Sequence, residues 1–471
     1  MNESAVESQV RALTQLLLSP AGIAAAVAFC VLVVALLVNP RLKWPILVLM
    51  MFVSTLSFHV EVGTVRAVRL MFPFDQLRSQ ARPICGLLLL MLLLPTIMSP
   101  RGWRVRLIAG AAAALLVFQL IISVRLLLAG LIDRGAVSLL LFPLIFTVMA
   151  VGLGRWLQDW GDARTLVRCI FFTGIVFTFA TCLQLAVNRG AIVRGNRLFG
   201  TTGNPQQAAL LITGVLPAGC YLLIRRGEYK LLRLATGTII ALLLVFLVWT
   251  GSRTGLLMSV IGLGLVFRAR IGRMLGATIV IGVFTLLSFQ IYSESTLSIT
   301  GMFIRGDTRS QVWRGLFERF LENPFAGEVG EMWSVGESSY LSTAANSGLI
   351  GLLPLALFVG ATVWGLFGLQ RVRRRLGEEV MLADLITASL VSLLVGAIFE
   401  GYLLGTMTFQ VFCLYAYIAL MRFVREAVQV SEVAAAAEWQ QQQHAASQGN
   451  DHETFDAHGH PHVPPVFADQ F

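Results

Sequence analysis

Long runs of apolar residues recur along the chain and constrain its fold more than any other feature. Each run is about 17–22 residues long, which matches the length that an α-helix needs to cross a lipid bilayer. Since a bilayer cannot hydrate unpaired backbone groups, such runs must cross it as helices. With 56% hydrophobic and only 13% charged residues, the chain does not belong to the soluble globular class. The sequence predicts an all-α polytopic transmembrane helical bundle.

The pattern predicts twelve or thirteen spans within a membrane domain over residues 20–430. The expected spans are Pro20–Val38, Trp44–Val60, Pro83–Ser99, Val105–Val124, Ala136–Leu153, Arg168–Asn188, Pro205–Ile224, Leu231–Thr250, Thr254–Phe267, Arg273–Tyr292, Gly348–Leu369, Met381–Phe399 and Tyr402–Met421. A polar lead-in, residues 1–19, precedes them, and the start shows no cleavable signal peptide. The Ala-, Gln- and His-rich tail, residues 431–471, is predicted to be disordered and cytoplasmic.

Basic residues predict the orientation of the bundle. Three groups follow every second span: Arg225, Arg226, Lys230 and Arg233; Arg268, Arg270 and Arg273; and Arg371, Arg373, Arg374 and Arg375. By the positive-inside rule these connections are cytoplasmic. The intervening connections, residues 189–204, 251–253, 293–347 and 400–401, are then expected on the other side. They also contain arginines, which topology does not require there.

Residues 293–347 form the one long polar connection between predicted spans. Irregular backbone is not tolerated in lipid, so this loop must lie in water or line a cavity. It contains Trp313, Trp333, several arginines and several carboxylates, but no Gly-Ser repeats. This composition is typical of a folded, partly helical loop and not of a flexible linker.

Three groups of polar residues are predicted to share the non-cytoplasmic face. Arg197 precedes a Gly-Thr-Thr-Gly-Asn-Pro turn that contains Asn204, Arg253 lies in Gly-Ser-Arg-Thr-Gly, and Arg305 and Arg309 lead into the long loop. A single arginine at a span end can simply extend to the interface. Several on one face favour a basic pocket, because the planar guanidinium group binds phosphate oxygens in pairs.

Other kinds of site lack support in the sequence. There is no phosphate-binding glycine loop, no nucleophile elbow and no metal-ligand spacing. The six cysteines all lie in apolar runs and are expected to be buried hydrophobic residues. We therefore expect no cofactor and no metal, and we attribute the net charge of +10 to membrane topology and not to nucleic-acid binding.

Three motifs carry a resemblance to a known family. They are Arg197–Ala209, the Ser-Arg-Thr-Gly turn at 252–255, and the loop from Arg309 through Asn-Pro-Phe-Ala-Gly at 323–327 and Ser-Tyr-Leu at 339–341 to Gly-Leu-Ile-Gly-Leu at 348–352. Over about residues 190–370 the chain resembles the O-antigen ligase and O-antigen polymerase superfamily of bacterial membrane glycosyltransferases. The first third matches this superfamily only in hydropathy.

The resemblance implies an enzyme of the inner membrane that transfers a glycan from undecaprenyl diphosphate at the periplasmic face. Polymerases extend the lipid-linked glycan into a surface or exopolysaccharide. Ligases move it to lipid A core, and some relatives move it to protein. Expected partners are the lipid-linked glycan, the bilayer, a flippase and a chain-length regulator.

One departure from the family favours a polymerase over a ligase. Many ligases carry a His-Asn pair where this chain has Glu337 and Ser338, and the long loop contains no histidine. Glu337 is therefore the best candidate for a general base, with Glu400 as the second. A solvated loop acid is the alternative interpretation of Glu337.

The remaining site predictions follow from the matched motifs. Arg197, Arg253, Arg305 and Arg309 are expected to bind the diphosphate, and Arg253 also to stabilise the leaving group. Asn204, Trp313, Tyr340 and Glu400 are expected to support the site. A lipid-glycan flippase or transporter would instead place charges deep inside several spans, and a scaffolding protein would need no arginines on this face.

Overall fold

The computed structural model describes residues 31–56, 70–98, 110–194, 197–225, 229–268, 308–328, 338–405 and 407–449. These residues are almost entirely helical, which confirms the predicted all-α class. The helices are α3 (Lys43–Leu56), α4 (Phe74–Ser79), α5 (Ala81–Met98), α6 (Gly110–Leu128), α7 (Ile132–Phe146), α8 (Leu153–Trp156), α9 (Trp160–Asn188), α10 (Pro205–Ile224), α11 (Lys230–Thr250), α12 (Arg253–Val266), α15 (Thr308–Glu322), α16 (Ser339–Arg373), α17 (Val380–Phe399) and α18 (Phe409–Gly449). Short segments η1 (Pro40–Leu42), η2 (Thr147–Gly152), η3 (Arg189–Ala191), η4 (Gly200–Thr202), η5 (Gly377–Glu379) and η6 (Tyr402–Leu404) connect them, together with strands β1 (Val193–Arg194) and β2 (Arg197–Leu198).

The chain is a multi-pass membrane protein. The described residues include 8 helices that are long and apolar enough to cross a membrane, or up to 9 if the pair Val31–Val38 and Pro40–Leu56, bent by 115°, forms one span. The predicted span Arg273–Tyr292 and most of Pro20–Val38 lie outside the described residues. The polytopic bundle is thus confirmed, and the predicted number of twelve or thirteen spans remains a prediction.

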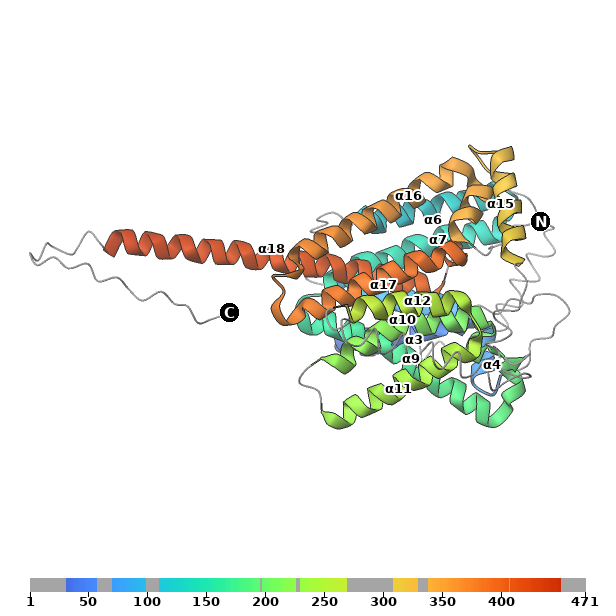
Figure 1. Cartoon of the computed structure of the whole chain (residues 1–471), viewed down its shortest axis with the longest axis horizontal. Helices are drawn as coiled ribbons and strands as arrows, with labels where there is room; N and C mark the ends of the chain where they lie inside the picture. The colour runs from blue at the N-terminus through green and yellow to red at the C-terminus, as the bar shows by residue number, and fades with distance from the viewer. Residues whose placement is uncertain are drawn as a thin grey trace, which may run out of the picture. The chain divides into compact units, whose positions relative to one another are not determined.

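Contacts divide the chain into one unit up to Val424 and a second from Arg425. In the first unit α6 packs on α7 and α16, while α12 packs on α10 and α17. Figure 1 shows these helices running side by side. Helices α10 and α17 are interior, since 83% and 78% of their most apolar stretches are buried, against 28% for α11.

Helix α16 begins earlier than the sequence predicts. The expected span starts at Gly348, but helical structure begins at Ser339, and the helix breaks at Gly348, where φ is 55° and ψ is −152°. The first part, Ser339–Ser347, is rich in small polar residues and is almost entirely buried. Because the hydropathy of this segment is low, a prediction based on apolar runs does not include it.

Helix α18 extends into the segment that was expected to be disordered. Residues 431–449 continue the helix, whereas the tail after Gly449 lies outside the described residues. The helical part is rich in alanine, glutamine and glutamate, which have high intrinsic helix propensity. Low hydrophobicity therefore did not prevent local helix formation here.

Candidate functional site

Arg197 ties a small hairpin to the end of α11. Strands β1 and β2 pair antiparallel, with Arg194 opposite Arg197. The Arg197 Nε donates to the carbonyl oxygen of Thr250 at 2.7 Å, and its Nη2 donates to that of Gly251 at 3.4 Å. These carbonyl groups end α11, where intrahelical donors run out, and a cation is favourable there. In this structure, therefore, Arg197 is a structural tie for the turn between α11 and α12.

The turn itself is built by two helix ends that meet almost without a loop. Ser252 caps α12, since its Oγ accepts from the backbone N–H of Gly255 at 3.1 Å. Arg253 is the first residue of α12, and its side chain is exposed. A Cβ on Gly255 would lie only 2.6 Å from the Cβ of Ala209. Glycine is thus needed for α12 to approach α10 closely at this point.

Asn204 begins α10 beside this contact. Its side-chain oxygen accepts from the backbone N–H of Gln206 at 2.8 Å, and Pro205 occupies the first helical turn. This is a regular N-cap followed by a proline that needs no hydrogen-bond partner. The predicted supporting residue Asn204 therefore fixes the start of α10.

Arg309 connects its own helix, α15, to α12 and to the end of α17. Its Nη1 donates to Thr254 Oγ1 at 3.0 Å, and its Nη2 forms an ion pair with Glu400 Oε1 at 2.9 Å. The guanidinium carbon also lies 5.9 Å from the ring centroid of Phe399, and the Trp313 ring lies 5.8 Å from the same centroid. Only 8% of the Glu400 side chain is exposed, so the carboxylate has its charged partner in a largely dry environment.

Glu400 also connects the end of α17 to the start of α16. Its backbone oxygen accepts from the Ser339 backbone N–H at 3.2 Å and from the Ser339 Oγ at 2.6 Å. Ser338 caps α16 through the backbone N–H of Leu341. Tyr340, two residues after Ser338, donates its hydroxyl to the carbonyl oxygen of Leu394 in α17 at 3.2 Å. These bonds hold the buried first part of α16 against α17.

The structure thus brings together most of the predicted site. Hydrogen bonds and one ion pair link β2, the α11–α12 turn, α15, the end of α17 and the start of α16. We call this group the arginine cluster; it consists of Arg197, Ser252, Arg253, Thr254, Arg309, Ser339 and Glu400. The predicted site residues Arg305 and Glu337 lie outside the described residues. Glu337 immediately precedes Ser338, the cap of α16.

Arg125, which the sequence analysis did not select, holds the Asn-Pro-Phe-Ala-Gly turn of the long loop. Its Nη2 donates to the carbonyl oxygens of Ala326, of Gly327 at 3.1 Å and of Asn346 at 3.4 Å. The backbone N–H of Glu328 donates to Ala345 at 2.8 Å. An arginine at the C-terminal end of an apolar span was the available signal, but only the fold shows which loop it contacts.

The same turn fits into the break of α16. The backbone N–H of Leu349 donates to the carbonyl oxygen of Pro324 at 2.8 Å. Gly327 and Gly348 both have positive φ, 66° and 55°. A Cβ on Gly348 would lie 2.5 Å from the carbonyl carbon of Phe325, and one on Gly327 would lie 2.4 Å from the Ser347 nitrogen. Only glycine allows the two backbones to approach this closely.

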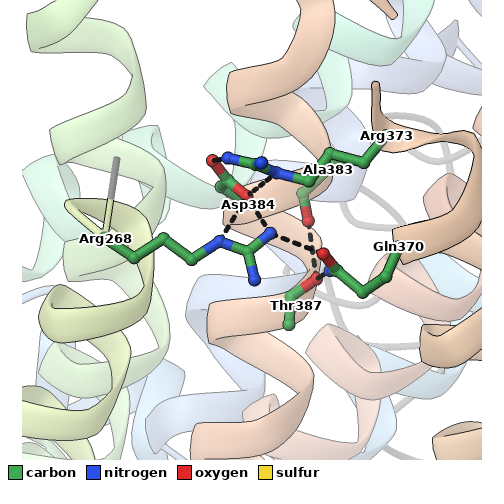
Figure 2. A network of polar contacts seen from close by, with 6 residues as sticks. All are labelled: Arg268, Gln370, Arg373, Ala383, Asp384 and Thr387. Carbon is green, nitrogen blue, oxygen red and sulfur yellow. Dashed lines mark hydrogen bonds and ion pairs between the residues drawn. The ribbon is translucent and has the colours of Figure 1, made fainter. Parts of the chain in front are cut away.

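A second polar network lies at the opposite end of α17. Asp384, only 2% exposed, accepts from Arg373 Nε and Nη2 at 2.8 Å each and from Arg268 Nε at 2.9 Å. Gln370 accepts from Arg268 and donates to Thr387 at 2.8 Å (Figure 2). From the sequence, both arginines were expected only to mark membrane topology. The missed signal is Asp384, a lone carboxylate inside an apolar run.

Neither the protein-family models nor the curated proteins compared with this chain give a match. Within the described ranges, no group of three or more His, Cys, Asp or Glu side chains is placed to hold a metal ion. The interpretation of the arginine cluster as a functional site therefore rests on its geometry and on the motif resemblance.

Proposed function

We propose that the protein polymerises oligosaccharide repeat units linked to undecaprenyl diphosphate, on the periplasmic face of the inner membrane. The observation that carries the proposal is the convergence of separate motifs. Arg197 and Arg309 are far apart in sequence, yet both contact the turn that contains Arg253, at 2.7–3.4 Å, and Arg309 also pairs with Glu400 at 2.9 Å. These are the segments that resemble the O-antigen polymerase and ligase superfamily.

The exposure and position of the three arginines distinguish their proposed roles. Arg197 and Arg309 bind protein atoms and thereby fix the α11–α12 turn from two sides. Arg253 has an exposed side chain at the first position of α12. A helix N-terminus favours an anion, and a guanidinium group binds two phosphate oxygens at once. We therefore assign Arg253 the direct contact with the diphosphate, and Arg197 and Arg309 the positioning of that turn.

The proposed reaction is a glycosyl transfer. A hydroxyl of the incoming repeat unit attacks the anomeric carbon of the growing glycan, and the bond from that carbon to the diphosphate breaks. Undecaprenyl diphosphate leaves with the bonding electrons, and a carboxylate accepts the hydroxyl proton. Glu337 is the proposed base because in sequence it directly precedes Ser338, the cap of α16, within the motif that resembles the superfamily. Arg253 stabilises the charge that develops on the leaving group.

Point variants test this assignment in the deletion strain. Arg253→Lys keeps the charge but loses the paired donors, so polymer should fall sharply at normal protein level. Glu337→Gln keeps hydrogen bonding but cannot accept a proton, and general-base assistance is worth roughly 10²–10⁴ in rate. The matched control is Arg314→Lys, which changes an exposed arginine of α15 outside the cluster.

The readout is a gel of lipid-linked and transferred glycan for each complemented strain. Normal polymer in both Arg253→Lys and Glu337→Gln would contradict the proposed mechanism. Full-length polymer that stays on the lipid carrier would instead assign the protein to the ligases, which is the second candidate function.

A further inference from the structure

Helix α15 presents two different apolar surfaces. One faces the bundle: Leu316 is 1% exposed and Trp313 lies against Phe399. The other faces outward, because Phe317 and Leu321 are 50% and 59% exposed. These two residues are four positions apart, so they are neighbours on the helix surface.

A polar face completes the helix. Its residues are exposed and lie together on a helical projection of about 100° per residue: Gln311, Arg314, Glu318 and Glu322. The helix therefore has a charged sector opposite a wide apolar sector, of which only part is covered by the bundle. A helix in water would expose such aromatic side chains at a cost, whereas a helix at a membrane surface buries them in the acyl region.

We call Phe317, Leu321 and Phe325 the outward apolar stripe; it continues directly into an exposed apolar surface of α16. Phe325, 72% exposed, ends the stripe, and its carbonyl oxygen accepts from the backbone N–H of Ile350 at 3.3 Å. Ile350, Leu353 and Leu357 of α16 are 51%, 64% and 59% exposed. Because α16 is one of the helices long and apolar enough to span a membrane, we expect this surface to contact acyl chains. The α15 stripe is therefore contiguous with a surface whose partner is lipid.

The length of the exposed apolar surface on α16 indicates how deep in the membrane the contact between Phe325 and Ile350 lies. Exposed apolar residues on α16 continue to Phe367, which at ~1.5 Å per residue lies ~26 Å from Ile350 along the axis. That distance is close to the ~30 Å thickness of the hydrocarbon core. Ile350, and with it Phe325, consequently lies at one edge of the core. Figure 1 shows α15 crossing the end of α6 and α16, as a helix at that edge would.

We propose that α15 is an interfacial helix whose Phe317, Leu321 and Phe325 side chains insert among the acyl chains of the adjacent leaflet. The helix thereby fixes the long loop at a constant depth beside the arginine cluster, through Arg309. The proposal does not depend on the reaction assigned above.

Spin-label accessibility tests this placement in the full-length protein reconstituted in phospholipid vesicles. Single cysteines replace Phe317, Leu321 and Phe325 in turn, with Leu353 as the lipid-facing reference and Glu318 as the water-facing reference. Oxygen concentrates in acyl chains and a charged nickel chelate stays in water. We expect the oxygen-to-nickel accessibility ratio at the three stripe positions to approach that of Leu353 and to exceed that of Glu318 severalfold.

Two results would overturn the proposal. A ratio at Phe317 and Leu321 equal to that at Glu318 would place the stripe in water. Low accessibility to both reagents would place it against a protein surface. If a cysteine-free background does not fold, replacement of Cys30 and Cys182 alone suffices, because Cys85, Cys169, Cys220 and Cys413 are buried and do not label.

Discussion

The ion pair between Arg309 and Glu400 is the contact on which the arginine cluster most depends. Both groups are largely shielded, with 28% and 8% of their side chains exposed. The loss of one partner leaves the other charge without compensation, which is more costly than the loss of both. We expect Arg309→Met and Glu400→Gln each to lower the free energy of unfolding by about 1–3 kcal/mol, and the double variant to lose no more than the worse single variant.

A double-mutant cycle on the purified protein in detergent measures this coupling through thermal or denaturant unfolding. The control is Arg314→Met with Glu318→Gln, a pair of opposite charges four residues apart on the exposed face of α15. That control pair should show coupling of only about 0.3–0.5 kcal/mol. Strictly additive losses at Arg309 and Glu400 would contradict the role assigned to their ion pair.

At the scale of elements, the contact between the loop turn and the break in α16 is the most restrictive. Gly348 has a conformation open essentially only to glycine, and its Cβ would collide with the Phe325 backbone. We expect Gly348→Ala to destabilise the protein by about 2–5 kcal/mol through strain and overlap. Gly360 of the same helix has no heavy atom within 4 Å of its would-be Cβ.

Gly360→Ala therefore serves as the control and should be neutral or stabilising by up to about 1 kcal/mol, since alanine favours helix. Unfolding temperature and limited proteolysis of the long loop report the difference. If both variants unfold and are cleaved alike, the turn does not depend on the break in α16.

For the molecule as a whole, the arginine cluster and the network around Asp384 lie at opposite ends of α17, and we predict that they face opposite sides of the membrane. Gln311 of α15 and Lys230 at the start of α11 are both exposed. A cysteine in place of Gln311 should react with an impermeant thiol reagent in intact spheroplasts. A cysteine in place of Lys230 should react only after lysis, because its connection carries the cytoplasmic basic residues. Labelling of both from the same side would refute the predicted topology.

Some of the fold could be predicted because apolar length and basic connections are local properties of the sequence. Helix α10 has the predicted bounds, Pro205–Ile224, since a cap and a proline mark its start. The helical segment before the predicted span Gly348–Leu369 was missed because Ser339–Ser347 is polar in sequence yet buried in the bundle. Tertiary contacts, and not hydropathy, determine the helical structure of that segment.

For the candidate site, too, the sequence predicted what depends on local properties and missed what depends on tertiary contacts. The sequence identified Arg253 and Arg309 as residues that membrane topology does not require. It could not show that Arg309 pairs with Glu400 or that Arg197 binds the end of α11, because those partners are distant in sequence. Arg125 was missed for the same reason, whereas Asp384 was a visible signal, a lone carboxylate inside an apolar run, that was overlooked.

The most direct test of the proposed function is the lipid-linked glycan of a strain that lacks this protein. Mass spectrometry of the extracted polyprenyl diphosphate lipids gives the number of repeat units that each carries. A polymerase predicts accumulation of single repeat units on undecaprenyl diphosphate, reversed by the wild-type protein but not by Arg253→Lys. Long polymer that accumulates on the carrier, or an unchanged distribution of lengths, would contradict the proposed polymerase activity.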